Sequence, residues 1–386
     1  MKITSSVGPV RLLAIVLSIW VCLISSSQAS SLIFWHNQTG LQARFMEKLV
    51  QEFNARQAQG SLKRTVKIHG EIGLELESTL MSRIDPSVRP DLMLIPSDMM
   101  GFRNELQLVE LPASWTSLGA PVRKEGLVAP ETHGVPVLQG NQLYLFYNKR
   151  LVKKVPATWQ ELKQQHGSFQ KRGLKTIGWP YCEPYYFLPF LQAFGTFDPE
   201  KLNTPSMEAT TAFYRELALS GLVPHDCGID CSTSRFFKGE FAYVISGDWA
   251  IAEAKAKLKE HFGLAHLPAI SDAQPMISGE VIQYLVFPKK EAFVKHEALL
   301  RDFSAFLVSE PVQARFFKEA DRLPVIAGYQ PPVSASSKPV PSGKSVFYSW
   351  IALRKGLQLL KAGERGIGMK MQKDLELLIR SESPAR

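Results

Sequence analysis

The chain has 386 residues, 45% of them hydrophobic, and a formal net charge of +9 at neutral pH. That length predicts two domains or two lobes, and the apolar content is ample for a core in each. The basic residues are scattered and are not interleaved with aromatic residues, which argues against a nucleic-acid-binding protein. The charge gives only a weak indication of an acidic ligand or an anionic membrane surface.

The first residues are typical of a secretory signal peptide. Lys2 and Arg11 supply positive charge, and an apolar run follows over 12–24. Ser27 and Ala29 then place small residues at the two positions that a signal peptidase reads. The run is short for a membrane span, so we expect cleavage near Ala29, with an uncleaved anchor as the alternative. No other segment reaches transmembrane length, which predicts an exported, periplasmic protein.

Three cysteines would remain after this cleavage. Cys227 and Cys231 close a tight loop in which Gly228 helps the chain turn, and an oxidising compartment permits a disulfide. We favour a Cys227–Cys231 pair with Cys182 as the odd thiol, although the sequence leaves the pairing open. A metal site is not expected, because this pair has only His225 nearby.

Short apolar strands alternate with amphipathic helices from the start of the mature chain, which predicts an α/β fold. A strand is expected over 31–37, followed by a helix over 40–57 with apolar residues spaced by four. A strand over 64–70, a helix over 76–84 and a buried strand over 92–95 follow. This order predicts parallel strands, and the loops at their carboxyl ends are the natural ligand sites.

Two later segments are suited to cross between lobes. Residues 134–151 form a long strand pattern interrupted at Gly140, and 279–290 form a second that returns to the first lobe. Between them, Thr158 and Glu161 form a capping box that opens a helix.

The end of the chain is expected to be helical apart from one loop. Ser309 is expected to cap a helix with proline in its first turn. The Pro- and Ser-rich stretch 328–343 is predicted as a loop, and helices over 345–360 and 366–380 close the chain.

Several segments, taken in order, carry a resemblance to a known family. They are LIFWHNQTG, RPDLMLIPSD, VPVLQGNQLYLFYNKRL with PATWQEL after it, FFKGEFAYVISGDWAI and RLPVI. The chain resembles the extracellular solute-binding proteins of ABC importers, in the sugar-binding branch typified by maltose-binding protein. The resemblance spans the mature chain and implies the two-lobe periplasmic binding protein fold of type II, which clamps its ligand by hinge closure.

This resemblance sets the expected organisation and partners. After a signal peptide at 1–29, it implies an N-terminal lobe of 30–140 plus 284–324 and a C-terminal lobe of 141–283 plus 325–386. The expected ligand is a sugar or oligosaccharide, and the expected partners are an inner-membrane permease and its ATPase. A monomer without catalytic activity or cofactor is expected.

The resemblance also implies which residues face the ligand. They are His36, Asn37, Asp98, Asn141, Glu183, Tyr185, Trp249 and Trp350. A pyranose has an apolar C–H face that aromatic rings can cover, and a rim of hydroxyls that carboxylates and amides can bind. The residue types therefore suit a saccharide without reference to the family.

Most of these residues also have a purely structural interpretation. Trp249 and Trp350 could be core residues, and Asp98 could cap the helix that follows it. His36 could be a satisfied surface histidine. Trp35, which alternates with Phe34, is expected in the core.

Two other ligands or partners stay open. Gln38-Thr39 and Pro96-Ser97 depart from the maltose binder's pattern, so maltose itself is in doubt. A polyol phosphate such as glycerol phosphate would need cleft arginines, for which Arg83, Arg103 and Arg235 are candidates. The partner could also be a membrane sensor kinase instead of a permease. An enzyme is disfavoured, because no G-x-S-x-G elbow, HExxH, P-loop or Gly-rich dinucleotide turn occurs.

Overall fold

The computed structural model describes residues 31–59, 67–72, 85–116, 118, 132–224, 226–330, 333 and 337–382. The expected signal peptide, the helix expected over 76–84, Arg83 and His225 lie outside these residues. Within the described part, no helix has the length and apolar character that a membrane crossing requires.

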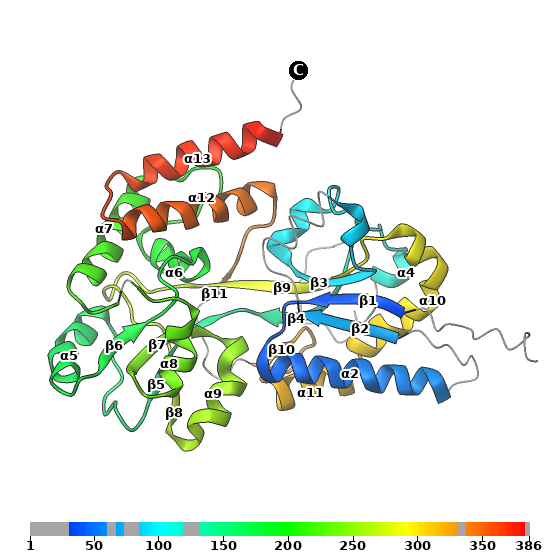
Figure 1. Ribbon diagram of the computed structural model, residues 1–386, viewed down its shortest axis with the longest axis horizontal. Helices are drawn as coiled ribbons and strands as arrows, with labels where there is room; N and C mark the ends of the chain where they lie inside the picture. The colour runs from blue at the N-terminus through cyan, green and yellow to red at the C-terminus, as the bar shows by residue number, and fades with distance from the viewer. Residues whose placement is uncertain are drawn as a thin grey trace, which may run out of the picture.

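The first sheet combines strands from the beginning, middle and end of the chain (Figure 1). Its order is β10-β4-β9-β3-β1-β2, and β11 pairs with β9 beyond this path. The strands are β1 (Ser31–His36), β2 (Lys67–Ile72), β3 (Leu92–Pro96), β4 (Val135–Gly140), β9 (Ser278–Val286), β10 (Leu323–Pro324) and β11 (Ser337–Pro339). β1 is parallel to both β2 and β3, which confirms the pairing expected from the strand–helix order. β9 runs antiparallel to β3 and β4.

Helices cover this sheet and enclose the first core. They are α2 (Gly40–Gln59), α4 (Ala113–Thr116), α10 (Lys290–Leu307) and α11 (Glu310–Ala320), with the short helices η1 (Pro86–Val88) and η2 (Ser97–Phe102). Phe34 of β1 and Phe53 of α2 both contact Phe303 of α10, with ring centroids 5.8 and 5.0 Å apart. The apolar residues of α2, which are spaced by four, therefore form one stripe that faces this core, as an amphipathic helix requires.

The second sheet has the order β6-β7-β5-β8, with β6 and β7 parallel and β5 antiparallel to both of its neighbours. Its strands are β5 (Leu143–Asn148), β6 (Lys175–Gly178), β7 (Phe241–Gly247) and β8 (Phe262–Ala265). Its helices are α5 (Trp159–Lys171), α6 (Pro184–Phe194), α7 (Pro205–Leu219), α8 (Ser234–Phe237), α9 (Ile251–Leu258), α12 (Lys344–Lys361) and α13 (Ile367–Glu382), with the short helices η4 (Ile229–Ser232), η5 (Asp248–Ala250) and η6 (Lys259–His261).

The crossing segments differ in one respect from the sequence prediction. The single long strand expected over 134–151 is two strands, β4 and β5, in two different sheets. Gly140 has φ +140° and Asn141 has φ +63°, so the backbone turns between them. β9 makes the second crossing, as expected. The loop expected over 328–343 contains the short strand β11, which pairs with β9.

One of the two predicted helix caps forms. The Thr158 side chain accepts a hydrogen bond from the backbone N–H of Glu161, as a capping box requires. The Glu161 carboxylate accepts from the N–H of Ala157. Ser309 occupies the N-cap position of α11 and Pro311 lies in its first turn, as expected, but the Ser309 side chain forms no cap: its hydroxyl donates to the carbonyl of Phe306 and accepts no helix N–H.

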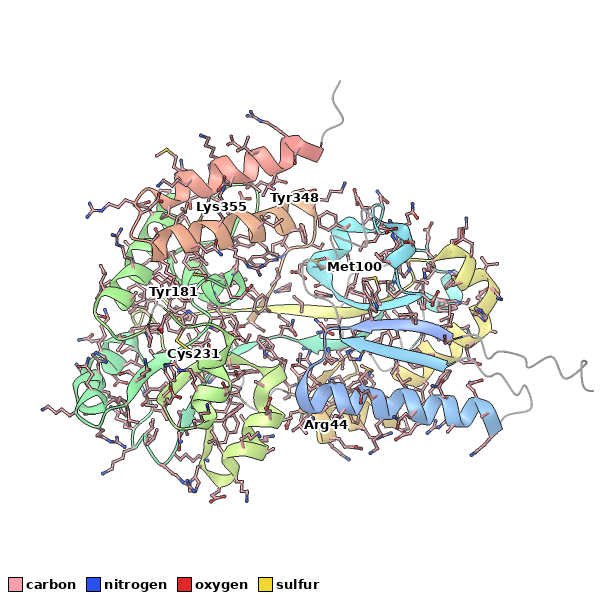
Figure 2. The ribbon with its side chains drawn as sticks, in the orientation of Figure 1. Arg44, Met100, Tyr181, Cys231, Tyr348 and Lys355 are labelled. Carbon is pink, nitrogen blue, oxygen red and sulfur yellow. A yellow bond between two sulfur atoms is a disulfide. The ribbon has the colours of Figure 1, made fainter. Side chains whose placement is uncertain are left out.

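Helix α12 lies against both lobes. Phe347 of α12 meets Phe102 of η2 edge-on, with ring centroids 4.5 Å apart. Gly101 is pressed so closely against the backbone of Gly343 that a Cβ atom there would come within 2.3 Å of it. Figure 2 labels Met100 and Tyr348 on the two sides of this contact. One buried apolar cluster therefore runs from the first lobe into the second.

Candidate ligand-binding cleft

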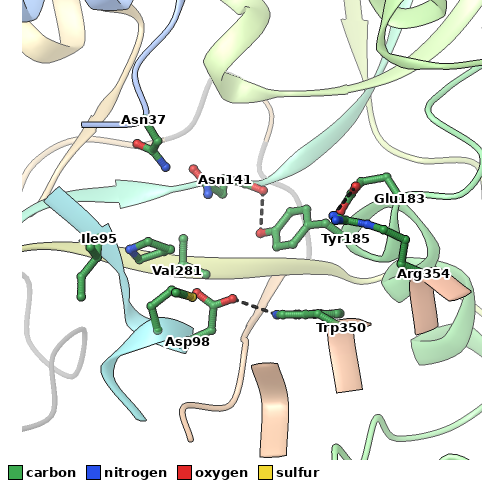
Figure 3. A pocket seen from close by; sticks show the side chains of 11 residues that line it. Asn37, Ile95, Asp98, Asn141, Glu183, Tyr185, Val281, Trp350 and Arg354 are labelled. Carbon is green, nitrogen blue, oxygen red and sulfur yellow. Dashed lines mark hydrogen bonds and ion pairs between the residues drawn. The ribbon is translucent and has the colours of Figure 1, made fainter. Parts of the chain in front are cut away.

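Two adjoining cavities lie between the lobes and share Asn37, Asn141, Glu183 and Tyr185. The smaller, of about 200 Å³, is called here the Trp350 compartment, and the larger, of about 480 Å³, the Trp249 compartment. The Trp350 compartment is further lined by Ile95, Pro96, Asp98, Met99, Val281, Trp350 and Arg354 (Figure 3). The Trp249 compartment is further lined by Gln38, Thr39, Gln42, Tyr186, Ile229, Ser232, Thr233, Ser246, Trp249, Ala250, Glu253, Gln283 and Arg322.

Strand ends place the polar and aromatic groups in the cleft. Asn37 directly follows β1, and Asp98 lies in the short helix after β3. Asn141 directly follows β4, and Trp249 lies just beyond β7. A sheet edge at which several strands end is the usual position of a ligand site in α/β proteins.

Asp98 and Trp350 join the two lobes in the Trp350 compartment (Figure 3). The indole N–H of Trp350 donates to Oδ2 of Asp98 at 3.0 Å, and its ring stacks on Phe197 with centroids 5.5 Å apart. Oδ1 of Asp98 is buried and has no well-aligned hydrogen-bond donor among the described residues. Burial raises the pKa of Asp98, and the Trp350 hydrogen bond and the nearby backbone N–H groups of Asp98 and Met99 oppose that rise. The carboxylate thus has an acceptor available for a ligand hydroxyl.

Glu183 and Arg354 form an ion pair at the edge of the same compartment, with Oε2 and Nη2 2.8 Å apart. Glu183 is the residue before α6, but its side chain does not cap that helix. Burial raises the pKa of Glu183, and the nearby Arg354 guanidinium lowers it. The pair leaves little net charge at this edge.

Tyr185 stands between the compartments. Its hydroxyl donates to the carbonyl of Asn141 at 2.9 Å (Figure 3). Its ring lies 6.3 Å from the ring of Trp249 and 6.4 Å from the ring of Trp350, centroid to centroid. The cleft therefore has an aromatic wall in each compartment and a shared aromatic partition.

The close approach of Trp249 to Gly247 explains the Gly-x-Trp sequence. A Cβ atom on Gly247 would come within 2.0 Å of the indole ring, so only glycine lets the ring lie against the backbone here. The ring also meets Tyr186 edge-on at 6.2 Å. Trp249 is half-buried, packs against the second core and lines the larger compartment. Trp249 is therefore partly a core residue and partly a residue of the cleft wall.

A buried ionic network lies beside the crossing strands. Arg322 donates from Nη1 to Asp248 at 2.5 Å and from Nη2 to the Asn141 side-chain oxygen at 3.2 Å. The backbone N–H of Asn141 donates to the other Asp248 oxygen at 3.0 Å. Burial raises the pKa of Asp248, and the Arg322 charge opposes that rise. Gly140 makes room, since a Cβ atom there would come within 2.1 Å of the Asp248 carboxylate.

Seven of the eight residues expected at the ligand line these cavities, and His36 does not. His36 is 1% exposed, its ring lies 5.5 Å from that of Phe34, and its Nδ1 accepts from the N–H of Gln38. Burial lowers its pKa to about 4, so it is neutral at physiological pH. Strand alternation turns His36 into the first core, and Trp35, expected in the core, is half-buried and packs against the apolar cluster that spans both lobes.

Several lining residues were missed by the sequence reasoning. They include Arg322, Arg354, Glu253 and Gln283. Arg322 does fall in RLPVI, one of the segments that carry the family resemblance. The arginines considered for phosphate, as far as they are described, lie elsewhere, and Arg235 is paired with Glu240 and Asp230.

The structure joins Cys227 to Cys231 and leaves Cys182 as a free thiol. The loop between the two joined cysteines carries Ile229, and Ser232 and Thr233 come directly after it. All three line the Trp249 compartment, and sequence reasoning gave none of them this place. Among the described residues, no group of His, Cys, Asp and Glu is placed to hold a metal ion.

The fold and the cleft together define a two-lobe binding protein. The model of the family "Bacterial extracellular solute-binding protein" matches residues 48–340, about three quarters of the chain. The chain belongs to this family.

Relatives that are similar in sequence are named for binding different solutes. A maltotriose-binding protein of Pyrococcus abyssi is 23% identical over 63% of this chain and 54% of its own length, so the chain spans about half of that relative. A galactooligosaccharide-binding protein of Bacillus subtilis is 24% identical over 61% of this chain and 60% of its own length. The sn-glycerol-3-phosphate-binding periplasmic protein UgpB of Escherichia coli O6:H1 is 21% identical over 82% of this chain and 79% of its own length.

Solved structures share the fold. The maltose/maltodextrin-binding domain MalE of Bdellovibrio bacteriovorus, bound to maltotriose, superposes with a TM-score of 0.77 at 22% identity, over 91% of this chain and all of that chain. The maltotriose-binding protein of Thermus thermophilus gives a TM-score of 0.76 at 18% identity, over 90% of this chain and all of that chain. At these identities the likeness establishes the architecture alone.

Proposed function

We propose that the chain is the periplasmic substrate-binding subunit of an ABC importer and that it binds an oligosaccharide across both compartments of the cleft. The proposal includes lobes divided as the sequence predicts, a signal peptide cleaved near Ala29, and delivery of the ligand as a monomer to a permease and its ATPase. No chemical step is assigned to the chain.

The carrying observation is the pairing of aromatic walls with an unfilled buried acceptor. Trp249 and Trp350 provide one wall each, on either side of Tyr185. Oδ1 of Asp98 is left without a well-aligned donor, and a sugar hydroxyl can supply one. Two apolar faces separated by a partition suit a ligand of two or more rings better than a single ring.

The second candidate ligand is a polyol phosphate, which the similarity to the sn-glycerol-3-phosphate-binding protein supports. The charges in the cleft disfavour it. Arg322 is neutralised by Asp248, and Arg354 by Glu183. Asp98 and Glu253 add negative charge with no described cation paired to them. A phosphate would have to displace these partners or bind beside carboxylates.

Thermal unfolding of residues 30–386 tests the proposal against maltotriose, a galacto-oligosaccharide and sn-glycerol-3-phosphate. A ligand that binds only the folded protein adds about 2.7 kcal/mol of stability at a hundredfold excess over Kd. We expect a rise in Tm with an oligosaccharide, and a smaller rise in a matched Asp98→Asn variant. A rise with the phosphate alone would overturn the saccharide assignment.

The choice between a permease and a sensor kinase as partner is tested separately. Reconstitution with a candidate permease and its ATPase is expected to give saccharide-stimulated ATP hydrolysis. Stimulation of a candidate receptor kinase without any effect on ATP hydrolysis would favour the sensor.

A further inference from the structure

A short disulfide-closed turn supplies part of the wall of the Trp249 compartment. Ile229 lies between the two joined cysteines, and Ser232 and Thr233 follow them. Ile229 is 65% exposed and lines a cavity that the half-buried Trp249 also lines. An apolar side chain in this position is available to contact a ligand.

The sulfur atoms anchor this turn to the second core. Cys231 is fully buried and Cys227 nearly so, in the apolar cluster that Trp249 also packs against. Figure 2 labels Cys231 inside the second lobe. The backbone carbonyl of Cys227 accepts from the N–H of Tyr181, four residues before the partition residue Tyr185.

Among the described residues, the other well-aligned hydrogen bonds of the turn are local. The hydroxyls of Ser232 and Thr233 both donate to the carbonyl of Ile229, at 3.2 and 2.9 Å. The N–H of Cys231 donates to the carbonyl of Gly228. These bonds fix the shape of the turn, whereas the burial of its two sulfur atoms in the cluster that Trp249 also packs against places the turn beside that ring.

We infer that the Cys227–Cys231 disulfide is a positioning element for the ligand: it holds Ile229, Ser232 and Thr233 in place as part of the Trp249 compartment. The class of ligand in this inference rests on the proposed function, whereas the positioning of the turn by the disulfide does not. Cys227 and Cys231 act through the residues they hold, and Ile229 is a specificity-determining residue that contacts an apolar ring face. The buried Ser232 is the residue of the turn that binds ligand hydroxyls. It lies beside Ser246 and Tyr186, and the hydroxyls of these two residues lack well-aligned partners among the described residues.

The test compares the double variant Cys227→Ala/Cys231→Ala with wild type and with Cys182→Ala, which removes a thiol outside the loop. Binding of maltotriose is measured by calorimetry, and Tm is measured without ligand. We expect at least a tenfold loss of affinity in the double variant and none in Cys182→Ala. A lowered Tm with unchanged affinity would show a purely structural disulfide and would overturn the inference.

Ile229→Ala and Ile229→Leu separate contact from loop closure, because both keep the disulfide. We expect a severalfold loss of affinity with alanine, recovery with leucine, and an unchanged Tm in both. Equal binding by Ile229→Ala and wild type would overturn the role of this side chain.

Hydrogen exchange of the ligand-free protein tests whether the disulfide holds the turn in place, and it needs no ligand. Failure of maltotriose to bind wild type would count against the proposed ligand alone. Backbone amides of 228–234 are expected to exchange faster in the double variant, while those of α12 are unchanged. Unchanged exchange over 228–234 would mean that the disulfide positions nothing.

Discussion

The two compartments of the cleft are joined across the lobes by different kinds of contact. At the Trp350 compartment the link is mainly apolar, through Phe102 and Phe347, with a hydrogen bond from Trp350 to Asp98 and an ion pair between Lys344 and Glu105. At the Trp249 compartment the link is ionic. Arg322 pairs with Asp248 in the interior, and Lys255 of α9 pairs with Asp321 after α11 nearer the surface.

This difference predicts that the Trp350 compartment is rigid and that the Trp249 compartment can open. Packed aromatic contacts tolerate little displacement and do not depend on salt, so the smaller compartment should keep its shape without ligand. Half-exposed ion pairs are weak and are screened by salt. α2 and α9, which lie side by side in Figure 1, are therefore the elements expected to separate first when the cleft opens.

The largest expected effect comes from breaking the ionic side. Arg322→Leu leaves Asp248 buried without its cation, which should lower the free energy of unfolding by about 3–5 kcal/mol. Denaturant titration measures this loss. Arg354→Leu, which removes a half-exposed arginine, is the matched control and should cost much less.

The loss in Arg322→Leu should also depend on pH. Burial raises the folded-state pKa of Asp248 above its unfolded value, so the folded state binds the proton more tightly. Stability therefore falls as pH rises from the unfolded pKa through the folded one. The variant should be closest to wild type in acid, and a loss that grows with falling pH would contradict this account.

Removal of the Trp249 ring is expected to have the next largest effect. Trp249→Ala should weaken saccharide binding by about 10- to 100-fold, equivalent to roughly 1.4–2.8 kcal/mol, with the fold intact. Calorimetry measures the affinity and circular dichroism the fold. Unchanged affinity in a folded variant would remove Trp249 from the ligand site.

A smaller effect is expected from adding one methyl group beneath the same ring. Gly247→Ala places a Cβ atom where the indole now lies, so the ring must shift at a cost of about 1–3 kcal/mol. We expect a loss of affinity no larger than that of Trp249→Ala and a modestly lower Tm. Gly167→Ala, where an added Cβ atom meets nothing within 4 Å and φ is not positive, is the matched control for adding a methyl group to a glycine.

The smallest effect is expected on the apolar side. Trp350→Phe keeps an aromatic ring beside Phe197 but removes the N–H donor to Asp98, so the pKa of Asp98 should rise further. Protonation of Asp98 removes a ligand acceptor, so affinity should fall as pH falls through that pKa. The fall should begin at higher pH in Trp350→Phe than in wild type, as binding measured across pH 4–8 can establish.

Sequence patterns were enough to predict the alternation of elements and the strand ends. Gly140 and the Gly-x-Trp turn could be identified because glycine marks close approach or unusual backbone angles. His36 shows the limit of a period-two pattern: alternation tells which residues share a face of β1, but not which face the helices cover. Ion pairs such as Arg322–Asp248 join positions 74 residues apart, and no local pattern reports them.

The placement of Ile229 also lay beyond the sequence. The CxxxC spacing favours a closed turn, but nothing in the turn says which cavity it borders. That depends on how η4 packs against β7, which is a property of the assembled lobe.

The contact of α12 with both lobes has a kinetic consequence. Because α12 packs against both lobes beside the Trp350 compartment, that side of the cleft acts as the hinge. The side formed by the Trp249 compartment must then open to let solute in or out. Residence time should then follow the lifetime of the contacts on that opening side, where the half-exposed Lys255–Asp321 pair is the one that salt can weaken, while the packed side sets how well the solute fits. Ionic strength would thus alter the rate of release more than the shape that is recognised.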